Sequence, residues 1–576
     1  MTDRTKTGLE ILQVSVLLGV LGNVLLRQTP WGLNAFLFVA TFAAALVVLM
    51  FRRRPELLTK TSLALIGAMV FFGSMFLIRD SIELRVYDTF AILIIMGVLL
   101  LANLEVKAQI AGAFHYAAGF VWSGITSAFG PLFILGSDIE WKAMPGGKLS
   151  RHLFSVLRGL AIALPLVLIF GALFMAADAA FEGMVNRVVN FEIDVAVSHV
   201  VLTSVFAWLS AGYLRGSLIT PFWKESTVAT EPVPADSASE KADADLSFVE
   251  KVVVEPLDEQ NGLPDNATIL EHINRSDPPN TEAASAEPPK KKWNLQNLDS
   301  SKLPSVFTFG TVETVIVLGL IDLLFLSFVA MQLPYFFGGM DLVQNTPDFK
   351  LADYARRGFG ELVAVAALVL PILLLSHWLL RKDGSRVAVI FKVLAGFQIA
   401  LLFVIMASAV QRLILLTGEL GYGLTTVRFY PMVFMTWLAV VFIWFAVTVL
   451  RNARQHFAWG ALWSAIFILA ATNLMNPDKF IVQTNIALMQ QGRDFDASYN
   501  SRLSDDALPV IVDSFASLST EDQQTVLTNL ANRHCYKVAE NDIRSWNYSR
   551  MKASEKLFPY DEILKNRNLY CDSEPE

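Results

Sequence analysis

The stretch DYARRGFGELVAVAALVLPILLLSHWLLRKDG (residues 353–384) decides the fold class of this chain. Its apolar residues continue for about six helical turns, and basic residues stand at both ends. Roughly 20 mostly apolar residues are enough for a helix to cross a bilayer, so the stretch predicts a membrane-spanning helix. Glu361 stands near the start of the apolar run, where burying a carboxylate is costly, and this makes it a candidate functional residue.

The composition extends this interpretation to the whole chain. Of its 576 residues, 54% are hydrophobic and 17% are charged, and the mean hydropathy is +0.47. Soluble domains carry roughly 25% charged residues, so these values are typical of an integral membrane protein. The net charge is −7 and there is no basic domain, so we expect the lipid bilayer, and not nucleic acid, as a partner.

Eleven segments have the length and apolarity of spanning helices. They are residues 9–26, 31–51, 61–78, 86–103, 159–177, 195–213, 311–336, 359–379, 389–416, 429–450 and 457–473. A twelfth segment, 110–136, has no acid, Lys or Arg, but five glycines and Pro131 interrupt it. It either crosses the membrane or lies at the interface as a re-entrant segment. We therefore expect an all-α integral membrane protein with about eleven transmembrane helices.

The orientation follows from the excess of Lys and Arg in cytoplasmic loops. Alternate loops are rich in basic residues, such as Arg52, Arg53, Arg54 and Lys60 in one of them, whereas Arg27 stands alone in its loop. This bias predicts a cytoplasmic N-terminus and a C-terminus outside, provided that residues 110–136 do not cross. The absence of a small-residue cleavage site after residue 26 predicts that the first span is retained.

Four regions follow from these patterns. Residues 1–223 form a membrane bundle of about six helices, and residues 305–476 form a second bundle of about five. Residues 224–304 are rich in Pro, Ala, Ser and acid, and this composition predicts a disordered cytoplasmic linker. Residues 477–576 are expected to form a small, soluble, helical tail.

The tail contains local helix signals and both cysteines of the chain. Ser504 is a candidate helix N-cap, and either Ser519 or Thr520 caps the next helix. Cys535 and Cys571 would lie in an oxidising compartment if the tail is outside. They form either a disulfide or two unpaired thiols, and their separation in sequence does not decide between the two.

Several phrases resemble a known family. They are RGLAIALPLVLIFGALFMAAD (158–178), DLLFLSFVAMQLPYFFGG (322–339), DYARRGFGEL (353–362), GYGLTTVRFYPMVFMTWLA (421–439) and NLMNPDKFIVQTN (473–485), with LSDDALPVI and IRSWNYSRMKA in the tail. Together they resemble a bacterial family of multi-pass membrane proteins classed as domain of unknown function 4173. The resemblance spans most of the chain, and the acidic linker is not part of the pattern. It implies a bacterial inner-membrane protein and supplies no established activity.

A constellation of charged residues is expected near the outer membrane face. Arg357 precedes Glu361 by four residues, so the two side chains share a helix face and can pair. Arg412 ends one span at this level and Arg428 leads into another. Thr425, Thr426, Asn473, Asn476 and Asp478 are further polar residues expected there. Guanidinium groups suit phosphate or carboxylate, so this level is either a pocket for an anionic ligand or an ion-pair network that locks helix ends.

Three polar residues lie within or beside other spans. Glu313 stands near the start of its helix, where the dipole favours a carboxylate. Asp322 lies deep in the same helix and is either a packed, hydrogen-bonded acid or a proton-coupling one. His199 lies about a turn inside the sixth span and is either a hydrogen-bonded packing residue or part of a proton relay.

Catalytic signatures are not found in this sequence. It has no GxxxxGK[ST], HExxH, CxxC or GxSxG motif, and its seven histidines are scattered without metal-ligand spacing. We therefore expect no cofactor and no metal.

Three functions stay open. The preferred one is a non-enzymatic envelope sensor or scaffold that recognises an anionic lipid headgroup or another envelope protein at the Arg357/Glu361/Arg412/Arg428 level. The alternative is a transporter or lipid translocase that uses the intramembrane acids, although the sequence has no internal repeat and no matching pair of broken helices. The third is a membrane-embedded enzyme acting on a lipid, with Glu361 as general base.

Overall fold

The computed structural model describes most of the helical part of the chain. It covers residues 2–141, 193–220, 310–337, 359–380, 385–414, 417, 423–537 and 542–567. The chain divides into two compact units, Met1–Ile219 with Gln296–Glu576, and Thr220–Leu295. Apart from Thr220, every described residue belongs to the first unit. The expected span 159–177, the whole predicted linker (224–304) and Cys571 lie outside the described residues.

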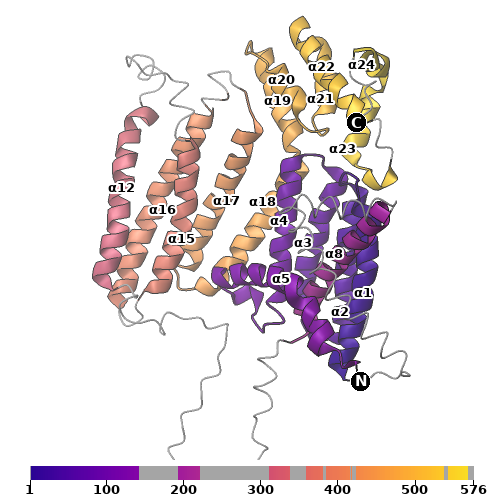
Figure 1. Ribbon diagram of the computed structural model, residues 1–576. Helices are drawn as coiled ribbons and strands as arrows, with labels where there is room; N and C mark the ends of the chain where they lie inside the picture. Colours follow the sequence, from indigo (N-terminus) through magenta and orange to yellow (C-terminus); the bar gives the residue numbers. More distant parts are fainter. Residues whose placement is uncertain are drawn as a thin grey trace, which may run out of the picture. The chain divides into compact units, whose positions relative to one another are not determined.

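The first group of helices is a bundle near the N-terminus. It consists of α1 (Asp3–Leu26), α2 (Leu33–Arg53), α3 (Lys60–Ile78), α4 (Ile82–Leu100) and α8 (Ile193–Leu218). Short connections make α1 to α4 alternate in direction, and α8 packs along α1 (Figure 1). Gly19 allows this close packing, because a Cβ there would lie 2.6 Å from the carbonyl oxygen of Thr203. Small residues at such contacts let membrane helices approach each other.

A further helix, α5 (Ala113–Phe133), begins and ends at the same end of this bundle. Just before it, Gln109 Nε2 donates to Thr61 Oγ1 in the first turn of α3, at 2.8 Å. Just after it, Asp138 accepts a 2.8 Å hydrogen bond from Nε of Arg4 in the first turn of α1. Because α1 and α3 run in the same direction, their first turns lie at one end of the bundle. The segment 110–136 therefore returns to the end from which it starts.

The second group of helices has its own apolar core. It consists of α12 (Thr311–Phe337), α15 (Phe359–Leu379), α16 (Ser385–Ile414), α17 (Thr426–Thr448) and α18 (Phe457–Met475). Buried aliphatic and aromatic side chains fill the space between them, among them Ala366, Leu373, Leu402, Val441 and Phe442. Figure 1 shows α12, α15, α16 and α17 side by side.

Ten described helices are long and apolar enough to cross a membrane. Nine of them overlap the expected spans, and the tenth, Ala113–Asp138, is the ambiguous segment. Helix α4 coincides with the expected span 86–103 but is not among the ten, because Glu83, Arg85 and Asp88 stand in its first turns. The expected fold class is confirmed: the chain is an all-α multi-pass membrane protein.

The described residues of the tail contain six α-helices. They are α19 (Pro477–Gln490), α20 (Ala497–Arg502), α21 (Leu508–Asp513), α22 (Thr520–Lys537), α23 (Tyr548–Leu557) and α24 (Asp561–Arg567). Their apolar faces form one cluster, which also includes Leu84 of α4 and Phe429 of α17. The core of the tail therefore continues into both groups of membrane helices.

One of the predicted helix caps in the tail is confirmed and the other is wrong. Ser519 Oγ accepts the N–H of Asp522 at 3.1 Å and so caps α22. Ser504 does not cap a helix, because α21 begins only at Leu508 and the Ser504 hydroxyl donates to Asp478 instead. A buried carboxylate that needs a donor competes successfully for this hydroxyl.

Candidate functional site

The candidate site lies where the tail meets the turn between α3 and α4. This turn, Arg79 to Ser81, exposes backbone N–H groups that neither helix can satisfy. Asp506 of the tail satisfies two of them: its Oδ2 accepts from the N–H of Asp80 at 2.7 Å and from the N–H of Ser81 at 3.1 Å. A carboxylate is favoured here, because the positive end of the α4 dipole is close.

Asp506 makes further contacts on its other side. Its Oδ1 accepts a hydrogen bond from the hydroxyl of Ser549, and Asn476 Nδ2 lies 3.3 Å away. Arg79 Nη1 pairs with the same oxygen at 3.5 Å. The Asp506 side chain is only 1% exposed, so these donors must compensate the loss of its hydration. One buried carboxylate thus joins α3, α4, the end of α18 and α23.

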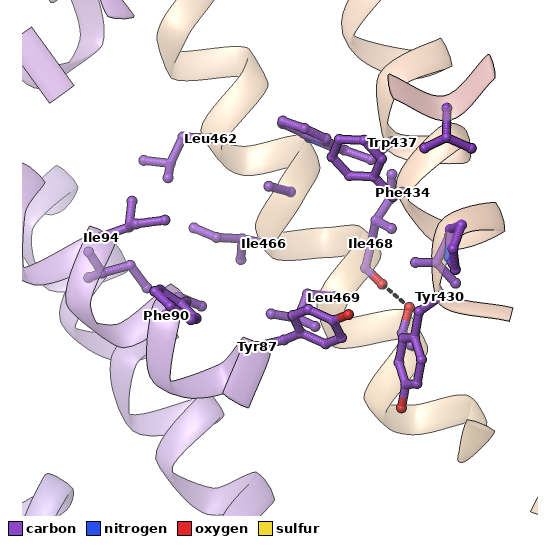
Figure 2. A pocket seen from close by; sticks show the side chains of 17 residues that line it. Tyr87, Phe90, Ile94, Tyr430, Phe434, Trp437, Leu462, Ile466, Ile468 and Leu469 are labelled. Atoms are coloured by element: carbon purple, nitrogen blue, oxygen red, sulfur yellow. Dashed lines mark hydrogen bonds between the residues drawn. The ribbon is translucent and has the colours of Figure 1, made fainter. Parts of the chain in front are cut away.

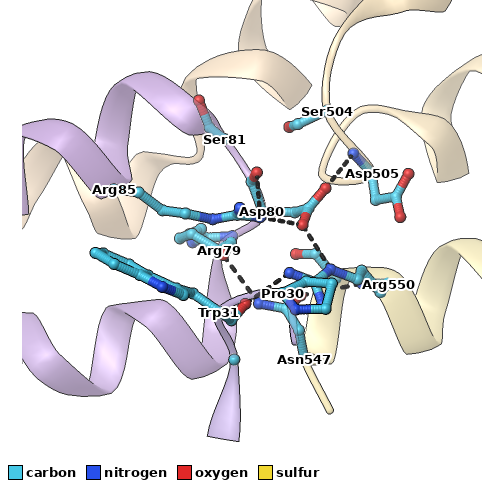
Figure 3. A network of polar contacts seen from close by, with 12 residues as sticks. Pro30, Trp31, Arg79, Asp80, Ser81, Arg85, Ser504, Asp505, Asn547 and Arg550 are labelled. Atoms are coloured by element: carbon cyan, nitrogen blue, oxygen red, sulfur yellow. Dashed lines mark hydrogen bonds and ion pairs between the residues drawn. The ribbon is translucent and has the colours of Figure 1, made fainter. Parts of the chain in front are cut away.

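Asp80 is the second acid of the junction (Figure 3). It lies between two guanidinium groups, pairing with Arg85 and accepting from Arg550 Nε at 2.7 Å. Arg550 also donates to the carbonyl oxygens of Ser545, at 2.9 Å, and of Trp31, at 2.6 Å. Arg550 therefore connects the tail with the loop between α1 and α2 as well as with the turn after α3.

Asn547 caps two helices with one side chain. Its Nδ2 donates to the carbonyl oxygens of Phe76 and Arg79, both at 2.9 Å, at the C-terminal end of α3. Its Oδ1 accepts the N–H of Arg550 at 3.1 Å and so caps the start of α23. These are groups that a helix end leaves unsatisfied, so Asn547 ties the orientation of α23 to that of α3.

The tail holds the second group of helices through the loop that leads into α17. Asn485 Oδ1 accepts the N–H of Leu424 at 2.6 Å, and Asn485 Nδ2 donates to the carbonyl oxygen of Leu424 at 3.0 Å. The hydroxyl of Tyr499 accepts the N–H of Thr426 at 2.7 Å. Gly423, with φ of +65°, provides the backbone turn that brings Leu424 to Asn485.

We call these tail contacts the docking network. Its members in the tail are Asn485, Tyr499, Asp506, Asn547, Ser549 and Arg550, and its partners are Trp31, Phe76, Ile78, Arg79, Asp80, Ser81, Leu424 and Thr426.

Asp478 is a buried acid at the edge of the docking network. It is 2% exposed, and its Oδ2 accepts from the backbone N–H of Ser504 at 3.2 Å and from the Ser504 hydroxyl. Its Oδ1 has no hydrogen-bond partner among the described residues. Burial raises the pKa of Asp478 from 3.8 to about 6; the hydroxyl of Ser504 lowers it, and the carboxylates of Asp506 and Glu83 raise it.

The predicted Arg357/Glu361/Arg412/Arg428 constellation is only partly within the described residues. Arg357 lies outside them, and the side chains of Glu361 in α15 and Arg412 in α16 are not described. Arg428 lies in the first turn of α17, and its Nη1 donates to the carbonyl oxygen of Gly423. The constellation therefore stays a prediction, as does the disulfide, since the Cys535 side chain and Cys571 are likewise not described.

Of the other predicted polar residues, Glu313 and Asp322 both lie in α12, and His199 lies in α8. Glu313 Oε2 accepts the N–H of Gly310 at 3.0 Å in the first turn of α12. Asp322 is 4% exposed, and neither carboxylate oxygen has a hydrogen-bond partner within the described part of the chain. His199 Nδ1 lies 2.9 Å from Asn23 Nδ2 and links α8 with α1. These positions do not bring the three residues together into one site.

The polar residues at the end of the last expected span meet partners from elsewhere in the chain. Asn473 donates to Asp88 of α4 at 2.8 Å, whereas Asn476 and Asp478 contact Asp506 and Ser504 of the tail. In the described ranges, no group of three or more His, Cys, Asp or Glu side chains is arranged to hold a metal ion.

Sequence reasoning missed the residues at the centre of the docking network. Asp80, Asp506 and Arg550 were not singled out, although two signals were available. Arg79–Asp80–Ser81 places two charges in a short turn between two apolar helices, and the phrases LSDDALPVI and IRSWNYSRMKA contain Asp506, Asn547, Ser549 and Arg550. Charges in a tight turn beside a membrane helix need partners, which is the physical signal for a docking surface.

One comparison with known proteins gives a match. The family model described as Domain of unknown function (DUF4153) matches residues 61–249 and 274–514, which is more than half of the chain. The family number expected from the sequence phrases, 4173, is corrected to 4153. Neither a curated protein nor a solved structure matches the chain.

Proposed function

The chain belongs to the family described as Domain of unknown function (DUF4153), and from that premise we propose that it is a non-enzymatic envelope sensor or scaffold of a bacterial inner membrane. Its helical tail would lie outside the membrane, and its ligand would be an anionic headgroup or another envelope protein. The observation that carries this proposal is that the tail binds both groups of membrane helices at once.

The docking network has two separate arms. One arm, centred on Asp506 and Arg550, holds the connections at the end of the first helix group. The other, formed by Asn485 and Tyr499, holds the loop that leads into α17 of the second group. A change in the distance between α4 and α17 must therefore strain or break one arm. Through the docking network, ligand binding among the membrane helices would change the conformation of the tail.

Arg428 supports a ligand site coupled to the tail. Its guanidinium donates to the carbonyl oxygen of Gly423, and the next residue, Leu424, is held by Asn485 on both its N–H and its C=O. An anion bound by Arg357, Arg412 and Arg428 would compete with the Gly423 carbonyl oxygen for hydrogen bonds from the Arg428 guanidinium. The loop held by Asn485 would then respond to ligand occupancy.

The charge distribution supports the proposed orientation. Arg52 and Arg53, at the end of α2 away from the tail, pair with Glu10 of α1 at 3.0 and 2.6 Å. Arg54 follows them at the same end. Basic residues concentrate on the cytoplasmic side of membrane proteins, so the end opposite the tail would face the cytoplasm.

The test compares Glu361→Gln and Arg428→Ala with Lys479→Ala, an exposed residue of α19 whose side chain makes no contact in the docking network. Proteins and lipids that co-purify with the full chain are quantified, together with amide exchange in the tail. We expect both site variants to change the co-purifying molecules and to speed exchange around Asn485. Wild-type behaviour of both variants would exclude the sensor proposal.

A transporter is the second candidate, and one observation favours it. Asp322 of α12 is buried without a hydrogen-bond partner, and Gln398 of α16, which is 0% exposed, also has no partner for either side-chain atom among the described residues. Helices α12 and α16 pack along each other. Unpaired polar groups within a helix pair mark ion pathways in many membrane proteins. An Asp322→Asn variant should then abolish proton-coupled flux, and unchanged flux of every candidate substrate would exclude this alternative.

A further inference from the structure

An apolar groove runs along α18 between α4 and α17 (Figure 2). Its volume is about 440 Å³, which is within the range of roughly 300–1,000 Å³ found for small-molecule sites. Phe90 and Ile94 of α4 form one wall, and Phe434 and Trp437 of α17 form the other. The floor is formed by Leu462, Ala465, Ile466, Ile468 and Leu469 of α18. All these side chains are apolar except for the indole N–H of Trp437, which donates to the carbonyl oxygen of Ala461.

The groove opens at the side of the helices. Phe90 is 53% exposed, Ile94 is 40% exposed and Phe434 is 37% exposed. Their helices have spanning length, so in a membrane these surfaces meet hydrocarbon and not water. An apolar groove of this kind has no charged group that would retain a polar ligand, and its natural occupant is a hydrocarbon chain.

The length of the groove matches one leaflet of a bilayer. On α18 its lining runs from Leu462 to Thr472, which corresponds to about 15 Å at 1.5 Å per residue. This is half of the roughly 30 Å hydrocarbon core. The lining ends at Tyr87 on α4 and at Tyr430 on α17, and both tyrosines lie at the tail end of their helices. The groove therefore lies in the leaflet next to the tail.

The tail end of the groove is polar. The ring centroids of Tyr87 and Tyr430 lie 5.2 Å apart. Figure 2 labels both tyrosines among the residues that line the groove. The Tyr430 hydroxyl is 3.4 Å from Ser81 Oγ, and Ser81 in turn donates to Glu83 Oε2 at 3.0 Å. Glu83 is half-buried and makes no ion pair within the described residues.

The charge at this polar end is negative. The neighbouring cations are engaged elsewhere: Arg85 pairs with Asp80, and Arg79 donates to the carbonyl oxygens of Asn473 and Leu474. Asp478 adds a second carboxylate close to Glu83, with an oxygen that has no partner among the described residues. A headgroup that donates hydrogen bonds and carries a positive charge is complementary to this arrangement, whereas a purely anionic headgroup is repelled.

We propose that the groove binds one acyl chain of a phospholipid with an ammonium headgroup, of the phosphatidylethanolamine type, with Glu83 facing the ammonium. The site is distinct from the Arg428 level, which would take an anion, and it does not depend on the sensor proposal. The tyrosines at the polar end mark the boundary between chain and headgroup, where aromatic residues with a hydroxyl are favoured.

The experiment uses the full chain, purified in detergent and stripped of lipid. Native mass spectrometry measures the binding of phosphatidylethanolamine and phosphatidylglycerol that carry the same acyl chains. We expect phosphatidylethanolamine to bind about tenfold more tightly, from one charge-assisted hydrogen bond. Equal binding, or a preference for phosphatidylglycerol, would overturn the headgroup assignment.

Two groove-filling variants test the chain site. Ala465→Phe, on the floor, and Ala91→Phe, on the α4 wall, should each reduce binding of both lipids about tenfold or more, because the ring occupies the volume of the chain. Ala471→Phe is the matched control, since Ala471 is an exposed residue of α18 outside the groove. A monodisperse size-exclusion profile shows that each variant is folded. Wild-type lipid binding by folded groove variants would overturn the proposal.

The variant Glu83→Gln distinguishes the contribution of the headgroup to lipid binding from that of the acyl chain. Removing the charge should leave acyl-chain binding in place and bring the affinities for the two lipids to within about twofold of each other. A retained tenfold preference for phosphatidylethanolamine would show that Glu83 does not face the ammonium.

Discussion

Asp506 Oδ2 lies 2.7 Å from the backbone nitrogen of Asp80, although 426 residues separate them in the chain. The carboxylate of one acid thus accepts the N–H of another, just before the first turn of α4. The arrangement is stable because the Asp80 side chain has its own cations, Arg85 and Arg550. Two acids with separate sets of donors hold the tail on the first helix group.

Replacing Asp506 by Asn should loosen the tail. The amide keeps the shape but loses the charge that pairs with Arg79, and its NH₂ group faces donors that need an acceptor. We expect the free energy with which the tail docks on the helices to become less favourable by on the order of 2–3 kcal/mol. Amide exchange in α21 and α23 should become correspondingly faster. Asp513→Asn, whose carboxylate is 58% exposed and pairs with Lys556, is the control and should exchange like the wild type.

Gly423→Ala should be more destabilising than Gly492→Ala. Both glycines have positive φ, +65° and +82°, so both alanines carry the strain of a left-handed conformation, about 1 kcal/mol. A Cβ at Gly423 would also lie 2.8 Å from Asn485 Oδ1, whereas a Cβ at Gly492 meets nothing within 4 Å. The extra loss at Gly423 should be about 1–2 kcal/mol, from the displaced Asn485. Thermal unfolding in detergent measures both, and equal shifts would contradict the role of Asn485.

Asp478 should make the stability of the tail depend on pH. Its pKa in the folded protein, about 6, is above the ordinary value of 3.8. At pH values between these two, the Asp478 carboxyl group therefore keeps its proton in the folded tail and loses it in the unfolded tail. This group therefore favours folding most at about pH 4 and below, and its contribution is lost as the pH rises to about 6. The free energy of unfolding should therefore differ by on the order of 3 kcal/mol between a pH below both pKa values and a pH above both.

The measurement for Asp478 is thermal unfolding at pH 5 and pH 7.5. Asp478→Asn keeps an acceptor for Ser504 but does not titrate, so the variant should lose less stability than the wild type between the two pH values. Comparing the two proteins removes every pH-dependent contribution that the wild type and the variant share. The same pH dependence in both proteins would assign the effect to another group.

Helix α5 should not cross the membrane. Single reporter cysteines at Gln109 and Ser137, which are exposed and flank the helix, are placed in a background without Cys535 and Cys571. A membrane-impermeant thiol reagent is added to cells with a permeabilised outer membrane. Both positions should resist labelling, while a cysteine at Ser573 in the tail is labelled. Labelling of one flank alone would mean that α5 crosses and that every later loop changes sides.

The positions of the helices could be predicted from the sequence to a useful degree. Apolar runs such as residues 359–379 predict spans because the required length is a local property. The ambiguity of residues 110–136 could not be resolved in this way. Both a crossing and a returning helix are apolar, and only the contacts of Gln109 with Thr61 and of Asp138 with Arg4 show that α5 returns.

The candidate site was less accessible to sequence reasoning. The sequence indicates that Asn473 is a polar residue at the end of the last span, but it does not identify its partner Asp88, which is 385 residues away. Ser504 looked like a cap because its local pattern fits one, and a buried carboxylate from α19 takes its hydroxyl. Local patterns identify which groups need partners and not which partners they find.

The sequence by itself determined that this protein is an all-α multi-pass membrane protein, because in lipid a helix satisfies its backbone within the segment and so leaves a local signature. Only the tertiary structure decided that Asp506, Asn485 and Asn547 of the tail hold the ends of α3, α4 and α17. It also decided that α4, α17 and α18 enclose an apolar groove. These features depend on which helices pack together, and packing is settled by the whole set of buried surfaces and not by any one stretch.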